Sequence, residues 1–440
     1  MREYFLDKIS KKEIVCGVCG LGYVGLPLAV EKAKAGFKTI GFDVQKIKVD
    51  MVNNSRSYVG DVTDHDLKSV VESGMFRATS NFDFVSEADF IAICVPTPLD
   101  VHQQPDISYV RESARMVAKK LRKNSMVVLE STTYPGTTEE LLKPILEEGS
   151  GLKCGQDFYL GFSPERIDPG NREYQTKNTP KVVGADSPEA TECISAMYKA
   201  ILGDRVFKVS SPKVAEMSKL LENIYRNINI GLINEMAILC HRMDINIWEV
   251  IEAAKTKPFG FAPFYPGPGL GGHCIPLDPY YLSWKAREFG FHTSMIESSM
   301  IINDRMPEYC TERASEILSK KFKKSLNGSR VIVLGVAYKN NVADYRESPA
   351  MPLIENLKTV GADVCFYDPY IDELEFRGRI YKGIKKENFS IKSLKEYDLV
   401  IIATVHSVID YEMVQKNSNY IFDTRNATKN VQIRDNIELL

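Results

Sequence analysis

The sequence predicts an α/β protein with two doubly wound parallel-sheet domains, joined by a central helical domain that contains a long helix. Three observations carry this prediction. Buried-strand patterns alternate with helical patterns in the first part of the chain, the same alternation returns near the C-terminus, and a long segment of helical periodicity separates the two. We therefore expect three domains, at residues 1–206, 207–325 and 326–440.

The first region begins with one complete strand–helix–strand unit. Residues 14–19 form a continuous apolar run, which is typical of a strand buried on both faces. Residues 26–35 have helical spacing, and residues 38–43 fit a second strand that ends in an acid. Residues 88–98 and 125–130 are two further strand candidates, separated by a basic helical segment. Strands that alternate with helices indicate a parallel, Rossmann-like sheet.

The same order of elements returns toward the C-terminus. Residues 330–335 form an apolar run into a glycine, residues 364–368 form another that ends in an acid, and residues 397–404 parallel residues 88–95. The stretch between the glycine and the acid is longer than in the first copy, and residues 338–341 replace its second and third glycines. We expect a second nucleotide-type domain with a different ligand.

The region between the copies, residues 212–306, has a helical pattern. At the period of an α-helix, one stripe of its long first helix is polar and the opposite stripe is apolar. The polar stripe contains Glu216, Lys219, Asn223, Arg226, Asn227 and Asn234, and the apolar stripe contains Met217, Leu221, Ile224, Ile228 and Leu232. Residues 258–279 then hold five glycines and six prolines. Such a loop has little regular structure and is usually functional when it is ordered.

A G-x-G-x-x-G motif at residues 20–25 follows the first predicted strand and opens the first helix. This spacing recurs by chance in many chains, but here it allows a tight turn, close approach of a pyrophosphate, and close packing of helix on strand. Asp43 ends the next strand, where a carboxylate accepts hydrogen bonds from both ribose hydroxyls and repels a 2′-phosphate. We expect NAD rather than NADP, although Lys46 and Lys48 lie near enough to attract a phosphate. The alternative is a simple helix-starting turn with a surface aspartate.

Cys274 lies on the glycine-rich loop, after Gly271, Gly272 and His273. Most cysteines are buried thiols that act as small hydrophobic side chains. Here the preceding glycines remove side-chain bulk, so a substrate can approach the sulfur, which favours a nucleophile. His273 is adjacent and is expected to point elsewhere. Asp278 follows one helical turn later and can orient a water or take a proton, although an aspartate there is often only a helix cap.

Two groups of basic and amide side chains suggest anion binding. Lys219 and Asn223 are one turn apart on the polar stripe. The stripe is either a solvated helix face or a pair of donors for the oxyanion that forms when the thiol attacks a carbonyl. Arg346 lies in the second copy's phosphate-loop position, with Lys339 upstream. Arg346 alone is compatible with an ordinary ion pair, but with Lys339 and Arg425 it fits a second anionic nucleotide.

The composition is that of an ordinary folded protein and excludes several classes. The 440 residues are 44% hydrophobic and 26% charged, and 56 basic side chains balance 58 acidic ones, which argues against a nucleic-acid partner. No apolar run is long enough for a membrane span, and the N-terminus lacks a signal-peptide core. Nine cysteines suit a reduced cytoplasmic protein, and six scattered histidines predict no metal site. Cys16 and Cys19 form a C-x-x-C pair, but both lie in the first predicted strand.

Together these motifs resemble the UDP-glucose/UDP-N-acetylmannosamine dehydrogenases, over nearly the whole chain. The likeness rests on residues 20–27, 95–98, 130–137, 162–166, 216–223, the Cys274 loop and residues 346–348, in this order. It implies an NAD-dependent oxidation of C6 of a UDP-sugar to a carboxylate in two hydride transfers. It also implies an N-terminal NAD domain, a central domain whose long helix builds a dimer, and a C-terminal domain that binds UDP.

The resemblance assigns roles to individual residues. Cys274 would trap the aldehyde as a thiohemiacetal, which a second NAD would oxidise to a thioester that water releases. Thr133 would help to position the water, and Glu165 would take part in acid–base chemistry. The expected catalytic residues are Cys274, Lys219, Asn223, Asp278, Thr133 and Glu165. The expected NAD contacts are Gly20, Gly22, Tyr23, Val24, Gly25, Asp43, Pro96, Thr97, Thr133 and Arg346. The expected UDP-sugar contacts are Glu165, Arg166, Lys219, Asn223, Tyr265, Gly269, Gly271, Tyr338, Lys339 and Arg425.

Two segments separate this chain from the UDP-glucose branch of the family. Residues 166–171 and the longer loop at residues 257–269 resemble the branch that acts on N-acetylated sugars. Residues 258–261 with residues 280–285 are most similar to UDP-N-acetylglucosamine 6-dehydrogenases. Extra room and aromatic surface near the sugar suit an acetamido group. We expect a cytoplasmic homodimer or larger homo-oligomer that forms UDP-N-acetylglucosaminuronate, with UDP-N-acetylmannosamine or UDP-glucose as alternative substrates. Two other hypotheses are a nucleotide-sugar-binding protein without catalysis, and an alcohol dehydrogenase that stops at the aldehyde and forms one NADH per sugar.

Overall fold

The computed structural model describes residues 1–167, 173–174, 176–272 and 274–440. His273 and the 168–171 part of the predicted sugar-contacting segment lie outside these described residues. The chain divides into two compact units, the first Met1–Glu222 with Tyr280–Phe291, the second Asn223–Pro279 with His292–Leu440. In the described ranges no helix is long and apolar enough to cross a membrane.

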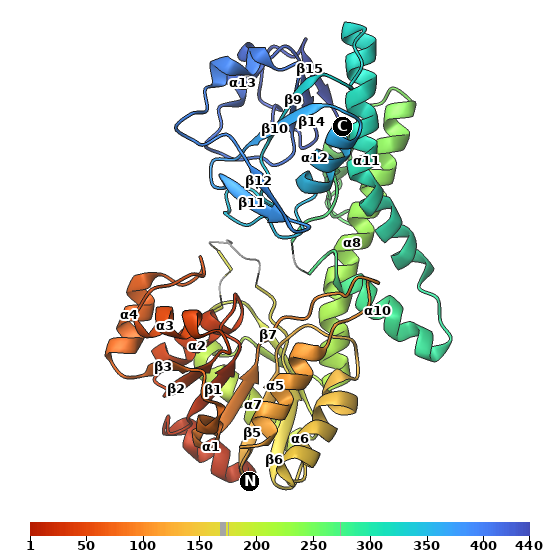
Figure 1. The fold of residues 1–440 in the computed structure, drawn as a ribbon. Helices are drawn as coiled ribbons and strands as arrows, with labels where there is room; N and C mark the ends of the chain where they lie inside the picture. Colours follow the sequence, from red (N-terminus) through yellow and green to blue (C-terminus); the bar gives the residue numbers. More distant parts are fainter. Residues whose placement is uncertain (168–172, 175, 273) are drawn as a thin grey trace. The chain divides into compact units, whose positions relative to one another are not determined.

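The first unit is built on an eight-stranded sheet in the order β3-β2-β1-β4-β5-β6-β7-β8 (Figure 1). Its strands are β1 (Cys16–Cys19), β2 (Thr39–Phe42), β3 (Phe76–Thr79), β4 (Phe90–Ile93), β5 (Ser125–Leu129), β6 (Phe158–Phe162), β7 (Lys181–Ala185) and β8 (Val206–Lys208). Neighbouring strands are parallel, apart from the antiparallel pair β6 and β7. The strands predicted from the sequence are β1, β2, β4 and β5, so the predicted doubly wound sheet is confirmed.

Helices cover both faces of this sheet (Figure 1). Helices α1 (Arg2–Ser10), α2 (Gly25–Lys34), α3 (Lys46–Asn53), α4 (Asp64–Glu72) and α7 (Pro188–Leu202) share one core, and α5 (Ser108–Ala118) and α6 (Lys143–Ser150) share the other. Phe90 and Ala92 of β4 belong to the first core, while Ile91 and Ile93 belong to the second. This alternation explains the continuous apolar runs, because both faces of a central strand are buried.

The second unit holds a parallel five-stranded sheet in the order β10-β9-β13-β14-β15. Its strands are β9 (Arg330–Leu334), β10 (Asp363–Tyr367), β13 (Leu399–Ile402), β14 (Ile421–Asp423) and β15 (Ile437–Leu439). Helices α11 (Ser294–Phe322) and α12 (Ala350–Thr359) pack on one face and α13 (Tyr411–Asn417) on the other. A hairpin of β11 (Glu373–Phe376) and β12 (Arg379–Lys382) accompanies the sheet. The predicted second Rossmann-like fold is therefore confirmed.

The central segment contains α8 (Pro212–Arg242), α9 (Ile247–Lys255) and α10 (Asp278–Ala286). Helix α8 has 31 residues. Its polar stripe is buried except at Arg226, and its apolar stripe is exposed at Met217, Leu221 and Leu232 but buried at Ile224. Glu216 is 0% exposed and Lys219 and Asn223 are each 6% exposed, whereas Leu221 is 63% and Leu232 is 55% exposed. The solvated-face explanation of the polar stripe is therefore wrong. Because burial of polar groups is costly unless they are paired or needed, the stripe must serve internal contacts or a ligand.

Lys32 of α2 is a buried lysine that the sequence pattern did not reveal. Its side chain is fully buried, and its ammonium, which forms no hydrogen bond with a described residue, lies 4.0 Å from the centre of the Phe90 ring and 4.8 Å from that of Tyr198. Burial lowers the pKa of Lys32 below its ordinary value of 10.5. Between those two pKa values the unfolded chain binds the additional proton, so the free energy of unfolding rises with pH over that window.

We expect Lys32→Met to stabilise the protein. Methionine keeps the volume and the contact with the two rings while it removes a buried amino group that forms no hydrogen bond with a described residue, so the free energy of unfolding at neutral pH should rise by about 1 kcal/mol or more. Chemical denaturation at several pH values checks this, with Lys34→Met on the same helix as the control. A variant that is less stable, or that keeps the full rise with alkaline pH, would contradict the assignment.

Candidate active site

The glycine motif of the first unit has the sterics that a dinucleotide requires. Gly20 has φ +90°, and a Cβ there would lie 2.5 Å from the carbonyl oxygen of Cys94. A Cβ at Gly25 would lie 1.8 Å from the Gly20 carbonyl oxygen, whereas a Cβ at Gly22 would meet nothing within 4 Å. The first and third glycines are thus needed for the turn and the packing of α2 on the sheet. The second leaves its backbone open to a pyrophosphate.

Asp43 is held beside this turn at the end of β2. Its Oδ2 accepts a hydrogen bond from the Leu21 N–H at 2.9 Å, and its Oδ1 accepts one from the Gln45 N–H at 2.9 Å. Each oxygen keeps a lone pair for a ribose hydroxyl. The side chain is buried, so the surface-aspartate alternative is wrong. Lys48 Nζ lies 3.9 Å from Asp43 Oδ2 and partly balances its charge.

The other expected NAD contacts of the first unit follow neighbouring strands. Tyr23 and Val24 follow β1, Pro96 and Thr97 follow β4, and Thr133 follows β5, so all lie at the carboxyl edge of the sheet, where such sheets bind ligands. Thr133 is fully buried, and its hydroxyl has no hydrogen-bond partner among the described residues. A buried hydroxyl without a partner points to a ligand or a water.

Helix α8 is anchored to this edge by Glu216, a residue for which the sequence suggested no individual role. Its carboxylate accepts hydrogen bonds from the Gly136 N–H at 2.5 Å, the Thr138 N–H at 2.9 Å and the Thr138 hydroxyl at 2.7 Å. Burial raises the pKa of Glu216, and these hydrogen bonds counteract the rise. The donors open the π-helix Thr137–Leu142, directly after the segment with Thr133. The contact therefore fixes Thr133 and the start of α8 relative to each other.

Lys219 lies one turn after Glu216 on the same buried stripe. Its side chain is 6% exposed, and its ammonium forms no hydrogen bond or ion pair with any residue that the structure describes. An unpaired buried ammonium is costly, so its retention points to a negative charge that a ligand supplies.

A buried ion network supports Glu165, which follows β6. Lys181 Nζ lies 2.7 Å from Glu130 Oε2 and 3.2 Å from Glu165 Oε2, and the Tyr198 hydroxyl donates to Glu130. The Arg166 N–H donates to Glu165 Oε1 at 2.8 Å. Burial opposes the charge of Lys181, but the two carboxylates raise its pKa overall. Lys181 and Tyr198 escaped the sequence analysis because their partners are remote in the chain.

The loop before Cys274 is shaped by contact with Tyr338, within the second unit. A Cβ at Gly271 would lie 2.9 Å from the Tyr338 Cβ, and one at Gly272, whose φ is +88°, would lie 3.0 Å from its ring. At Gly269, where φ is +133°, a Cβ would lie 3.0 Å from Pro349. Cys274 itself is partly exposed and forms no disulfide with another described cysteine. The glycines thus allow the loop before Cys274 to lie against Tyr338, another expected substrate contact.

Asp278 begins α10, as expected, and ties the Cys274 loop to α8. Its N–H donates to the Cys274 carbonyl oxygen at 2.9 Å, and its Oδ2 accepts from Asn223 Nδ2 at 2.5 Å. Both side chains are buried, Asp278 at 3% and Asn223 at 6% exposed. Asn227 Nδ2 donates to the Ile275 carbonyl oxygen at 3.2 Å and holds the same loop. The cysteine is therefore presented by a turn that an aspartate–asparagine pair fixes.

Three expected nucleotide contacts differ in their surroundings. Arg425 lies against the same loop, since a Cβ at Gly267 would be 2.3 Å from its Nη1. Burial lowers the pKa of Arg425 to about 10. Its guanidinium forms no ion pair with a described residue. Arg346 Nη2 lies 2.6 Å from Asp344 Oδ2, which is the ordinary ion pair that the sequence allowed. Lys339, directly after Tyr338, is partly exposed.

Tyr265, the remaining expected sugar contact, packs on α9. Its ring stacks on Trp248 at 6.1 Å between centroids, and its hydroxyl donates to Glu252 Oε1 at 3.0 Å. Tyr265 thus contacts Trp248 and Glu252 of α9, whereas Gly271 and Gly272 lie against Tyr338. Its role toward the sugar stays a prediction.

The dinucleotide turn with its ribose acid, the presented cysteine and the second nucleotide-type sheet define an NAD-dependent oxidoreductase. The chain belongs to the UDP-glucose/GDP-mannose dehydrogenase family, because it matches that family's NAD binding domain at residues 14–202, its central domain at 213–305 and its UDP binding domain at 332–430. The expected NAD cofactor, enzyme class and family are confirmed. The chain is an NAD-dependent UDP-sugar dehydrogenase.

Similar proteins span nearly the whole chain. Protein CapL from Staphylococcus aureus is 39% identical, over 93% of this chain and 95% of that protein. The UDP-N-acetyl-D-glucosamine 6-dehydrogenase of Salmonella typhi is 37% identical, over 90% of each chain. The solved structure of a UDP-D-ManNAc dehydrogenase from Pyrococcus horikoshii superposes with a TM-score of 0.87 at 31% identity, covering 97% of this chain and 99% of that one.

Proposed function

We propose that this enzyme oxidises the C6 hydroxyl of UDP-N-acetylglucosamine to the carboxylate, removing four electrons in two rounds. The observation that carries the proposal is the partly exposed Cys274, presented one turn before the buried Asp278–Asn223 pair on a loop that only glycines allow. A purely packing cysteine needs neither the bare loop nor the fixed carboxylate. The proposed domain limits are residues 1–206, 207–325 and 326–440.

The chain's own residues have the following proposed roles. NAD supplies the acceptor for one hydride in each round. After the first round, the Cys274 thiolate adds to the C6 aldehyde; a C–S bond forms and the carbonyl oxygen gains the electron pair and a proton. Lys219 and Asn223 stabilise that oxygen while it is negative. After the second round C6 is a thioester.

Release of the product requires a water. Thr133 helps to position it, and Asp278 and Glu165 act in the proton transfer as the water adds to the thioester carbon. The C–S bond then breaks, Cys274 leaves as the thiolate, and C6 is a carboxylate. One sugar thus consumes one water and gives two NADH, whereas an enzyme that stops at the aldehyde gives one.

Residues 166–171 and the loop at 257–269 support an N-acetylated sugar. The choice of N-acetylglucosamine rests on residues 258–261 with 280–285, and on the relative from Salmonella typhi that is named for this sugar. UDP-N-acetylmannosamine is the second candidate, because the superposed structure from Pyrococcus horikoshii is named for it. Purified enzyme with NAD and each UDP-hexose in turn tests the proposal. We expect the highest kcat/KM with UDP-N-acetylglucosamine, two NADH per sugar and a product with the mass of the uronate. Faster oxidation of another UDP-hexose would correct the sugar, and absence of NADH would refute the proposal.

We also propose a homodimer formed through the exposed apolar side chains of α8. These are Met217, Leu221 and Leu232 of the apolar stripe together with Tyr225 and Leu239, and all five are between 43% and 63% exposed. Several large exposed apolar side chains on one helix are typical of a protein–protein contact. Their position along a single helix suits a second copy of the same helix.

Replacement of this stripe by charge should separate the subunits. We expect the double variant Leu221→Glu/Leu232→Glu to be monomeric in light scattering coupled to gel filtration, because two acids would be buried without partners in the contact. Phe207→Glu, which replaces a 68% exposed ring outside the helix, is the matched control and should stay dimeric. An unchanged mass for the α8 variant would exclude this surface as the contact.

A further inference from the structure

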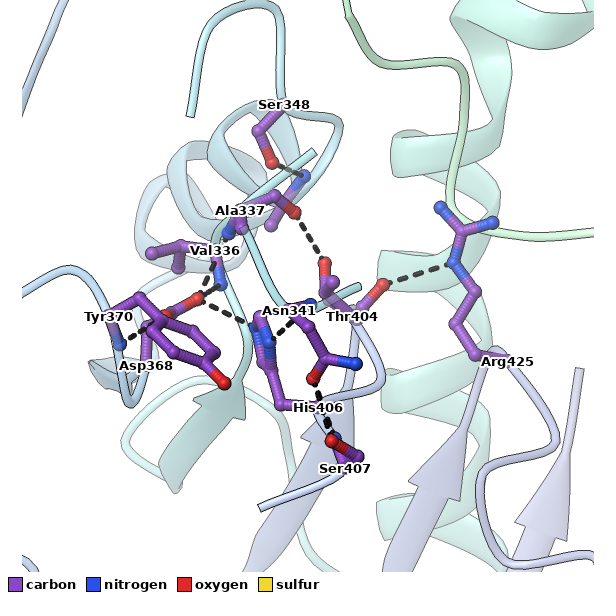
Figure 2. Close-up of polar contacts among 12 residues, drawn as sticks. Val336, Ala337, Asn341, Ser348, Asp368, Tyr370, Thr404, His406, Ser407 and Arg425 are labelled. Atoms are coloured by element: carbon purple, nitrogen blue, oxygen red, sulfur yellow. Dashed lines mark hydrogen bonds and ion pairs between the residues drawn. The ribbon is translucent and has the colours of Figure 1, made fainter. Parts of the chain in front are cut away.

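The second sheet carries a counterpart of Asp43, but one of its two carboxylate oxygens is already fully hydrogen-bonded. Asp368 follows β10, and its Oδ2 accepts hydrogen bonds from the Val336 N–H at 2.8 Å and the Ala337 N–H at 3.0 Å (Figure 2). Oδ1 accepts from the Tyr370 N–H at 2.9 Å. The fourth contact is His406, whose Nε2 lies 3.0 Å from Oδ2. Where Asp43 has room for a ribose, Asp368 has an imidazole.

The contacts of His406 fix its tautomer. The Asn341 N–H can only donate, so Nδ1, at 3.1 Å, must be the unprotonated acceptor. Nε2 therefore carries the proton and donates it to Asp368. Both side chains are fully buried. Burial alone would raise the pKa of Asp368, but the hydrogen bonds from His406, Tyr370 and Val336 keep it below its usual value.

His406 thus connects the buried Asp368 to Asn341, which ends the segment of residues 338–341. Asn341 has φ +60°, and its side-chain oxygen accepts from the Ser407 N–H at 2.8 Å and the Ser407 hydroxyl at 3.1 Å (Figure 2). A left-handed backbone costs free energy for a residue other than glycine and persists where its surroundings hold it. Tyr338 and Lys339, two of the expected UDP-sugar contacts, lie three and two residues before it. Tyr338 also lies against Gly271 and Gly272 of the Cys274 loop.

We propose that His406 is a positioning residue of the UDP site, a latch between Asp368 and Asn341 that holds residues 338–341 in the conformation that binds the nucleotide. This inference rests on the proposed function, because Lys339 and Tyr338 are assigned to the site there. His406 itself does not contact the ligand in this scheme. It sets the fraction of molecules in which residues 338–341 have the binding conformation. When that fraction decreases, the apparent affinity for the nucleotide decreases by the same factor.

Two substitutions separate the two bonds of the latch. In His406→Gln the side-chain amide nitrogen takes the place of Nε2 and still donates to Asp368, but no acceptor remains for the Asn341 N–H. In His406→Asn the side-chain oxygen takes the place of Nδ1 and accepts from Asn341, while Asp368 loses one donor. The latch predicts that His406→Gln binds UDP about tenfold more weakly at nearly unchanged Tm. It predicts that His406→Asn has the lower Tm but nearly unaltered UDP affinity.

The measurements are calorimetric titration with UDP, titration with NAD on the same samples, and thermal unfolding. UDP affinity that falls in His406→Gln while NAD affinity stays constant supports the latch. Equal UDP affinity in His406→Gln and the unaltered enzyme, or UDP affinity that simply follows Tm across both variants, overturns it. Absence of UDP binding by the unaltered enzyme would instead refute the proposed nucleotide site and, with it, this inference.

Discussion

Replacement of Cys274 by alanine is expected to abolish formation of the sugar acid while UDP binding persists. The thiol is the only side chain in the proposed scheme that forms a bond to C6, so its removal should lower kcat for the acid by at least about 10⁴-fold. Binding should survive because Cys274 is partly exposed and supports no described core contact of the second sheet. NADH absorbance and product mass measure the first effect, and calorimetry with UDP measures the second.

Cys274→Ser is the matched variant, because it keeps a polar group of similar size but replaces the thiol with a much weaker nucleophile. It should remain severely impaired. Acid formed at a normal rate by either variant would refute the covalent mechanism. Loss of UDP binding in both would show that the loop, rather than the sulfur, is the essential feature.

Lys219→Met is expected to lower kcat by about 10²- to 10³-fold and to stabilise the fold at the same time. The rate should fall because the variant lacks the charge that is placed for the oxyanion. The Tm should rise because the ammonium is buried and is paired with no described residue, so methionine removes an uncompensated charge. Steady-state kinetics and thermal unfolding of the same preparation test both effects.

Lys213→Met on the same helix is the control, since Lys213 is exposed and pairs with Glu140 at 3.1 Å. It should leave kcat unchanged. A Lys219→Met protein that is slower only because it is less stable would refute the functional assignment, since its Tm would then fall with kcat. A normal kcat at a raised Tm would show that the buried ammonium is dispensable.

The sequence predicted the fold well where local patterns reflect burial. The runs at residues 14–19 and 330–335 gave β1 and β9 because a central strand must be apolar on both faces. The glycine motif and Asp43 were found because their roles demand specific residue types at fixed spacing. The turn from Cys274 to Asp278 was predicted for the same reason.

The remaining parts of the site depend on contacts between residues that are distant in the chain. Lys181 meets Glu130 and Glu165 only through the antiparallel addition of β7 to the sheet, which no local pattern signals. His406 contacts Asp368 because the strands that precede them, β13 and β10, lie on either side of β9 in the sheet. The similarity between residues 397–404 and 88–95 ends two residues before this histidine. A histidine four residues after the buried strand β13 is a signal in the sequence that points to this edge of the sheet.

In the proposed dimer, helix α8 connects the subunit contact to the proposed catalytic side chains. Its inward face supplies Lys219 and Asn223, while its outward face is left apolar and unsupported in an isolated chain. Dilution below the dissociation constant of the pair would remove that outer support and loosen the inward side chains. Specific activity should therefore decline as the enzyme is diluted, and the decline should be absent when two copies are covalently joined.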